Sequence, residues 1–247
     1  MMKRYMFIIG AQRSGTTLLA KGLDLHPDLD FAKPIRPEPK YLLKPDAEVS
    51  AEDYEARYFN GVPAEVLRAE KSTSYIEYPE VARRIARLFP GARCIALLRD
   101  PVERAISNYW FSVQHGFEKR PPEEALDPAA ESDAKVAGLS ASPFAYLKRG
   151  RYLGFLDDYA GIVGADHLLV LQTERLVRDE STWSEVQGFL KLEPDPAPTT
   201  QERANAVPRE RPVAEATLRT LAEYFAPHNA ALARRYRVDL GLWRKPA

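Results

Sequence analysis

The chain has 247 residues, which suits one α/β domain, and its 35 lysines and arginines balance its 35 aspartates and glutamates. Zero net charge gives no electrostatic case for a nucleic-acid-binding protein, and no apolar run of about 18 residues predicts a membrane span. The single cysteine, Cys94, can form no intrachain disulfide and is expected as a packed core thiol. Because the N-terminal residues do not resemble a signal peptide, we expect a cytoplasmic protein.

Strands and helices are predicted to alternate along the chain. The expected strands are 5–9, a short one ending near Glu70, 93–98 and 167–172, the last followed by a loop. The expected helices are 16–25, 51–60, 79–89, 101–113, 144–159, 182–192 and about 213–235. Such alternation predicts an α/β, P-loop-like fold of three layers, with a central parallel sheet flanked by helices. We expect a single domain over 1–247, with a mobile surface insertion at about 118–142.

The most informative segment is YMFIIGAQRSGTTLL, residues 5–19. A buried strand, a turn bounded by Gly10 and Gly15, and a helix start bring backbone N–H groups and the positive end of a helix dipole together, which favours an anion. The glycine spacing is that of a P-loop, but Thr16 stands where nucleotide triphosphatases carry the phosphate-binding lysine. Arg13 supplies a cation three residues earlier. The loop therefore predicts a phosphate site but not an ATPase.

A second anion site is predicted in RDPVERAISNYW, residues 99–110. Ligands of parallel α/β sheets bind beyond the carboxyl ends of the strands, where this segment begins. Arg99 at a strand end and Ser107 two turns into the next helix would suit an anion, because arginine offers a planar fork to phosphate oxygens. The alternative is that Arg99 pairs with Asp100 or Glu103 at the helix start.

Four segments together carry a family resemblance: GAQRSGTT, PEPKYLL, EKSTSY and LRDPVERAISNYW. In order and spacing they resemble motifs of the sulfotransferases that use 3′-phosphoadenosine 5′-phosphosulfate (PAPS), most of all the branch with heparan sulfate sulfotransferases and soluble bacterial relatives. The resemblance covers about residues 5–190. It implies transfer of the PAPS sulfuryl group to a hydroxyl of a carbohydrate, lipid or other natural product, leaving adenosine 3′,5′-bisphosphate and needing no metal.

The resemblance also implies which residues hold the cofactor. Those expected to wrap its 5′-phosphosulfate are Arg13, Ser14, Gly15, Thr16 and Thr17, and those expected at its 3′-phosphate are Arg99 and Ser107. Tyr152 lies in a segment resembling one that closes over the nucleotide, and a core aromatic is an equal alternative. Arg209 or Arg211 in VPRERP would reach the 3′-phosphate from a covering loop, although we favour a solvated linker there.

The implied catalytic residues are Glu38, Arg13 and Lys71. Glu38 stands where heparan-type members carry a catalytic glutamate, and a carboxylate near the acceptor hydroxyl is a competent general base. Arg13 would stabilise charge on the leaving phosphate, since arginine does not readily donate its proton. Lys71 matches a lysine that lines the active site in those relatives. The alternatives are a solvated loop glutamate and a surface lysine.

Two other classes of protein remain open from these residues. A P-loop small-molecule kinase would use Asp100 as its magnesium ligand, but Thr16 in the lysine position argues against it. A non-catalytic nucleotide-binding protein would keep the sheet and lack the base. For the sulfotransferase we expect a small or medium hydroxyl-bearing acceptor, whose identity, like the oligomeric state, the sequence leaves open.

Overall fold

The computed structural model describes residues 3–195 and 212–243. The strands of its central sheet are β1 (Tyr5–Gly10), β2 (Leu29–Phe31), β3 (Leu67–Lys71), β4 (Arg93–Leu98) and β5 (Leu168–Gln172). They lie in the order β2-β3-β1-β4-β5, and every neighbouring pair is parallel. The predicted parallel sheet is confirmed. β2 was not predicted, because three residues are too few to show a period.

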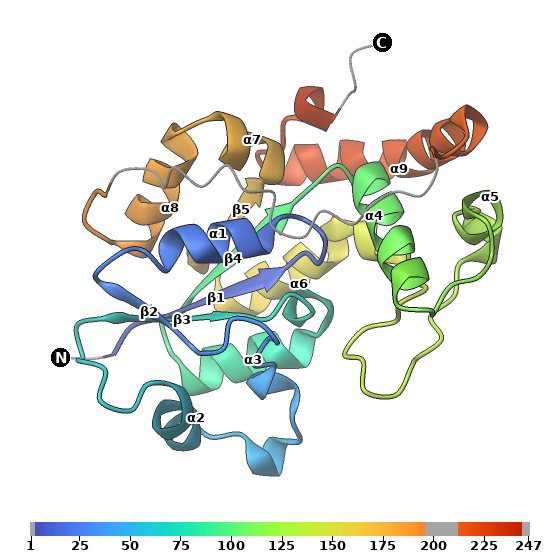
Figure 1. Ribbon diagram of the computed structural model, residues 1–247. Helices are drawn as coiled ribbons and strands as arrows, with labels where there is room; N and C mark the ends of the chain where they lie inside the picture. The colour runs from blue at the N-terminus through green and yellow to red at the C-terminus, as the bar shows by residue number, and fades with distance from the viewer. Residues whose placement is uncertain (1–2, 196–211, 244–247) are drawn as a thin grey trace.

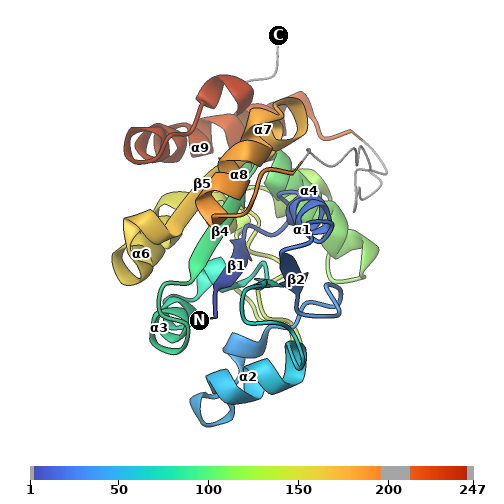
Figure 2. The same ribbon diagram turned by 90° about the vertical axis from the view of Figure 1, so that its left-hand side faces the viewer.

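Helices cover both faces of this sheet (Figures 1 and 2). They are α1 (Thr16–Leu23), α2 (Ala51–Tyr58), α3 (Pro79–Leu88), α4 (Pro101–Gln114), α5 (Pro122–Ala125), α6 (Tyr152–Val163), α7 (Thr173–Arg178), α8 (Ser181–Leu190) and α9 (Glu215–Arg235). One core joins the sheet to α1, α7 and α8, and another joins it to α3 and α6. Among the described residues, no helix has the length and apolar character needed to cross a bilayer.

The alternation of side chains along β1 explains why two cores form. Phe7 and Ile9 pack into the core shared with α3 and α6, whereas Met6 and Ile8 pack into the core shared with α1. A strand covered on both faces reads as one continuous apolar run, as this segment does. Cys94 of β4 is also fully buried, and burial raises its thiol pKa to about 12, so the expectation of a core thiol is confirmed.

Two predicted boundaries were wrong. The helix expected over 144–159 begins only at Tyr152, after a 3₁₀ turn at Lys148–Gly150. A Cβ added at Gly150 would lie 2.9 Å from the ring of Phe225, so the chain crosses α9 too closely for a regular helix with side chains. The loop expected after β5 is instead the short helix α7, which continues directly from the strand.

The segment 118–142, expected as a mobile insertion, packs in part against the core. Ala125 at the end of α5 and the following Leu126 are fully buried in a third cluster with α4 and α9. Glu118 binds Arg120 at 2.7 Å and accepts a hydrogen bond from the Tyr146 hydroxyl at 3.1 Å. These contacts hold both ends of α5. The mobility of the segment, and a single domain over 1–247, stay predictions.

Candidate active site

The two segments predicted to bind anions meet at the carboxyl end of the sheet. β1 lies between β3 and β4, so the loops that follow these three strands are neighbours. Arg13, in the loop after β1, donates from Nε to Ser107 Oγ at 3.1 Å although the two residues are 94 positions apart. The Arg13 guanidinium also lies 5.2 Å from the ring centre of Phe111, one turn further along α4.

The loop between β1 and α1 depends on its two glycines. A Cβ at Gly10 would lie 2.6 Å from Ile76, so only glycine fits without displacing that side chain. Gly15 precedes the first turn of α1 with a φ of 77°, in the left-handed region that favours glycine. The Thr173 hydroxyl lies 2.6 Å from the carbonyl oxygen of Ser14 and so ties this loop to the end of β5.

Thr16 and Thr17 form the buried first turn of α1. The first N–H groups of a helix have no partner within the helix, so this turn can offer donors to an anion. Ser14 is buried directly before it. The five loop residues that the sequence proposed for the 5′-phosphosulfate are therefore brought together by the strand–loop–helix geometry.

Three arginines lie near one another around the loop after β1. Burial and the nearby charges of Arg99 and Arg36 lower the pKa of Arg13 to about 10. Burial is the larger cause of this lowering, and repulsion from the two neighbouring arginines adds to it. A bound anion would relieve that repulsion. Arg36, in the loop after β2, was missed by the sequence analysis. Its only sequence signal is its place in PIRPEP, two residues before Glu38.

Arg99 lies beside the same loop, and it also pairs with Glu103, which was the alternative left open by the sequence. Its Nη1 approaches the carbonyl oxygen of Arg13 at 3.5 Å, while its Nη2 binds Glu103 Oε2 at 3.2 Å. Tyr152 donates its hydroxyl proton to the carbonyl oxygen of Arg99 at 2.9 Å. Tyr152 is only 2% exposed, and its hydroxyl also interacts with the Ser14 side chain of the loop after β1. It therefore packs as a core aromatic beside the site, and its contact with the nucleotide stays a prediction.

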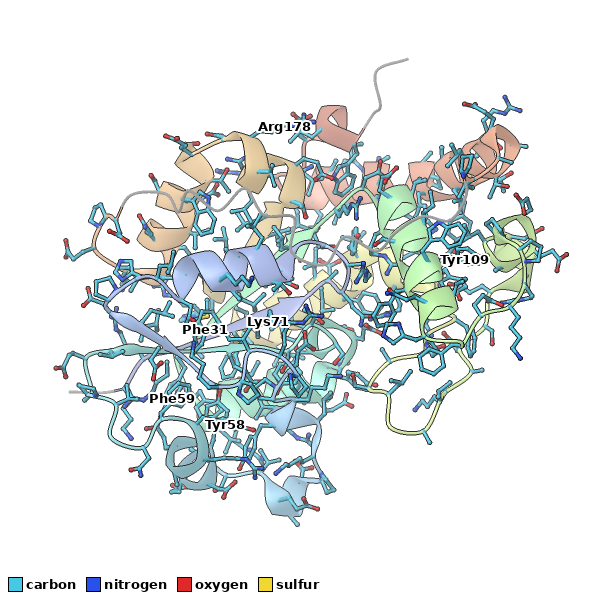
Figure 3. All side chains as sticks on the ribbon, in the orientation of Figure 1. Phe31, Tyr58, Phe59, Lys71, Tyr109 and Arg178 are labelled. Atoms are coloured by element: carbon cyan, nitrogen blue, oxygen red, sulfur yellow. The ribbon has the colours of Figure 1, made fainter. Side chains whose placement is uncertain are left out.

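Glu38 and Lys71 form a part-buried ion pair, with 2.7 Å between Oε1 and Nζ. Thr73 donates its hydroxyl to Glu38 Oε1 at 2.8 Å and its backbone N–H to Oε2 at 3.2 Å. Figure 3 shows Lys71 in the middle of the molecule, where β3 ends. The side chains of Lys71 and Glu38 are 3% and 16% exposed, which excludes a surface lysine and a fully solvated glutamate.

A second set of hydrogen bonds holds the chain segment that carries Glu38. The backbone N–H of Lys40 donates to Ser72 Oγ at 2.9 Å, and Ser72 Oγ donates in turn to Glu70 Oε1 at 2.6 Å. The N–H of Leu42 donates to the Tyr75 hydroxyl at 2.9 Å. Burial raises the pKa of the fully buried Glu70 carboxyl. The end of β3 thus fixes the backbone just after Glu38.

Arg149 is a further residue that the sequence analysis missed. It binds Glu77 from Nε at 2.8 Å, Gln12 Oε1 from Nη1 at 2.6 Å and Asn108 Oδ1 at 3.1 Å. These three partners belong to the segment after β3, the loop after β1, and α4. A buried arginine therefore joins three walls of the site. No local pattern marks it, since its partners come from distant parts of the chain.

Arg209 and Arg211 lie outside the described residues. Within residues 3–195 and 212–243, no three histidine, cysteine, aspartate or glutamate side chains gather as a set of metal ligands. The described site therefore offers arginines and backbone donors for an anion, together with a part-buried carboxylate that is oriented by a lysine.

No protein-family model matches the chain. Among curated proteins, it is 30% identical over 192 residues to heparan sulfate glucosamine 3-O-sulfotransferase 6 of Mus musculus, covering 75% of this chain and 51% of that protein. It is 27% identical over 182 residues to bifunctional heparan sulfate N-deacetylase/N-sulfotransferase 1 of Caenorhabditis briggsae, covering 71% of this chain and 20% of that protein. The chain thus spans between a fifth and about half of these relatives.

Solved structures show the same fold. A sulfotransferase from Alicyclobacillus acidocaldarius superposes with a TM-score of 0.79 at 24% identity, covering 99% of this chain and 100% of that one. A sulfotransferase domain from the curacin biosynthetic pathway superposes with a TM-score of 0.51 at 15% identity, covering 91% and 97%. These structures share the fold, and the identity to the heparan sulfate sulfotransferases shows that the chain belongs to the PAPS-dependent sulfotransferase family.

Proposed function

We propose that this protein transfers the sulfuryl group of PAPS to a hydroxyl of a carbohydrate, lipid or other natural product, with Glu38 as the general base. The observation that carries the proposal is the direct contact of Arg13 with Ser107, which joins the two anion motifs into one site. Arg36 acts electrostatically on Arg13 and lies two residues before Glu38. This effect of Arg36 supports placing the loop that carries the proposed base at the same site as the anion cradle.

The residues of this site suit the two anionic ends of PAPS. Its 5′-phosphosulfate would lie against Arg13 and the first turn of α1, where backbone donors and a cation coincide. Its 3′-phosphate would lie against Arg99 and Ser107. The Arg99–Glu103 ion pair is partly exposed, so an incoming phosphate can compete for the guanidinium.

PAPS, when bound, supplies a sulfuryl group attached to a good leaving group. Arg13 would stabilise the negative charge that develops on the leaving phosphate, and its permanent cation makes this role electrostatic. Glu38 Oε1 accepts hydrogen bonds from Lys71 and from the Thr73 hydroxyl. Among the described residues, Oε2 accepts one hydrogen bond, from the Thr73 N–H. Oε2 therefore has the capacity to accept the proton of an acceptor hydroxyl.

The test is an acceptor screen with isotopically labelled PAPS, read by mass spectrometry, on the wild type and Glu38→Gln. We expect the variant to lose transfer while calorimetry shows unchanged binding of adenosine 3′,5′-bisphosphate. Glu52→Gln, at an exposed position in α2, is the matched control and should change neither quantity. Undiminished turnover in Glu38→Gln would remove this residue from the mechanism. Thermal protection by ADP and magnesium instead of the bisphosphate would favour the kinase alternative.

A further inference from the structure

A cavity of about 230 Å³ lies at the amino end of the sheet, opposite the candidate active site. This is the end at the left of Figure 1. Five of the ten residues that line the cavity are basic and none is acidic. The basic residues are Lys3, Arg4, Arg93, His167 and Lys191. They come from the starts of β1, β4 and β5 and from the end of α8.

Main-chain carbonyl groups, not carboxylates, hold the two arginines of this cavity. Arg4 donates to the carbonyl oxygen of Lys191 at 3.0 Å and to that of Glu65 at 3.4 Å. Arg93 donates to the carbonyl oxygen of Phe189, and its guanidinium carbon lies 4.8 Å from the centre of the Phe189 ring. In the described part of the chain, neither arginine has a carboxylate ion pair, whereas Lys3 is paired with Glu55 at 2.5 Å.

The two guanidinium groups repel one another. Burial and the charge of Arg4 together lower the pKa of Arg93. Each guanidinium has five N–H donors, and the carbonyl contacts use two of those on Arg4 and one on Arg93. Two like charges are thus fixed in position with donors to spare, and no carboxylate within residues 3–195 and 212–243 pairs with either. An anion in the cavity would supply the missing charge, and arginine forks match phosphate and sulfate oxygens in geometry.

We propose that this cavity is a second anion site, which binds a small molecule bearing phosphate or sulfate groups. The cavity is several times larger than the ~30 Å³ that one water molecule takes in the liquid, so it has room for a pyrophosphate-sized group. Because the sheet separates it from Arg13 and Ser107, its ligand binds together with adenosine 3′,5′-bisphosphate and does not compete with it.

The experiment titrates inorganic pyrophosphate, and inorganic sulfate in parallel, into protein saturated with adenosine 3′,5′-bisphosphate. Nuclear magnetic resonance follows the backbone amides of Gly91 and Lys191, which line the cavity. We expect saturable shifts of both amides, with pyrophosphate binding more tightly because it carries more charge. Arg4→Gln and Arg93→Gln should each weaken binding on the order of tenfold or more. Arg83→Gln, which removes an exposed arginine from α3, should bind as the wild type does.

Two further variants keep the test decisive. Lys191→Gln alters an exposed side chain at the cavity rim, so it should fold normally and weaken binding even where an arginine variant fails to fold. Arg99→Ala should leave pyrophosphate binding at Gly91 and Lys191 unchanged, since Arg99 belongs to the other end of the sheet. Absence of shifts at the two amides, or equal shifts in the Arg4→Gln, Arg93→Gln double variant, would overturn the proposal.

Discussion

Replacing Asp100 by asparagine tests the electrostatics at the start of α4. Asp100 caps this helix, with its carboxylate accepting the Val102 N–H at 2.9 Å. Burial, together with the charges of Glu103 and Glu174, raises its pKa from 3.8 to about 6. Asparagine keeps a carbonyl oxygen for the cap and carries no charge, so it imitates the protonated form of the residue.

The raised pKa determines the direction of the pH dependence. The Asp100 carboxyl binds its proton more tightly in the folded state than in the unfolded state. The protonated carboxyl therefore contributes its full stabilisation of the fold below about pH 3.8, and this contribution is lost as the pH rises through about 6. A shift of this size corresponds to on the order of 3 kcal/mol. The asparagine variant also loses a favourable negative charge at the N-terminus of α4, which costs up to about 1 kcal/mol. We therefore expect Asp100→Asn to raise the free energy of unfolding by about 2 kcal/mol above pH 7.

Urea unfolding followed by tryptophan fluorescence, repeated across the pH range, measures this difference directly. The gain should shrink steadily as the pH falls below 6 and should vanish near the ordinary pKa of aspartate. Asp166→Asn, at an exposed position, is the control and should show no such trend. A variant that is less stable than the wild type at neutral pH, or a gain that does not depend on pH, would refute the reasoning.

Three other predictions concern the site. Arg99→Ala should weaken calorimetric binding of adenosine 3′,5′-bisphosphate by about 1.5–3 kcal/mol, with partial recovery in Arg99→Lys, because a charged hydrogen bond is lost; unchanged affinity would exclude the 3′-phosphate role. Ser72→Ala should lower kcat more than it changes KM and speed hydrogen exchange of the Lys40 amide, whose acceptor is removed. Gly10→Ala should destabilise the fold by about 1–3 kcal/mol through its 2.6 Å contact, whereas Gly161→Ala, with open space around it, should not; equal unfolding curves would contradict the packing argument.

Most helices and strands could be predicted from sequence patterns within a few residues of each element. The apolar run of β1, the glycine-bounded turn and the start of α1 were predicted together, and the structure confirms all three. Pro101 in the first turn of α4 likewise marked a helix start, since proline lacks the N–H that a first turn cannot use. β2 and the late start of α6 were not predictable locally. The first is too short for a pattern, and the second depends on α9 packing against Gly150.

The candidate residues of the site came from short motifs. Arg13 and Arg99 stand in loops that follow predicted strands, whereas Glu38 and Lys71 were implied only by the family resemblance. Whether those motifs face one another depends on strand order, which no single segment encodes. The tertiary structure alone decided that β1 lies between β3 and β4, and so that Arg13 meets Ser107. The same holds for the arginines at positions 36 and 149, whose charges act on residues far away in the chain. Their roles come from distance and burial, and these exist only once the chain is folded.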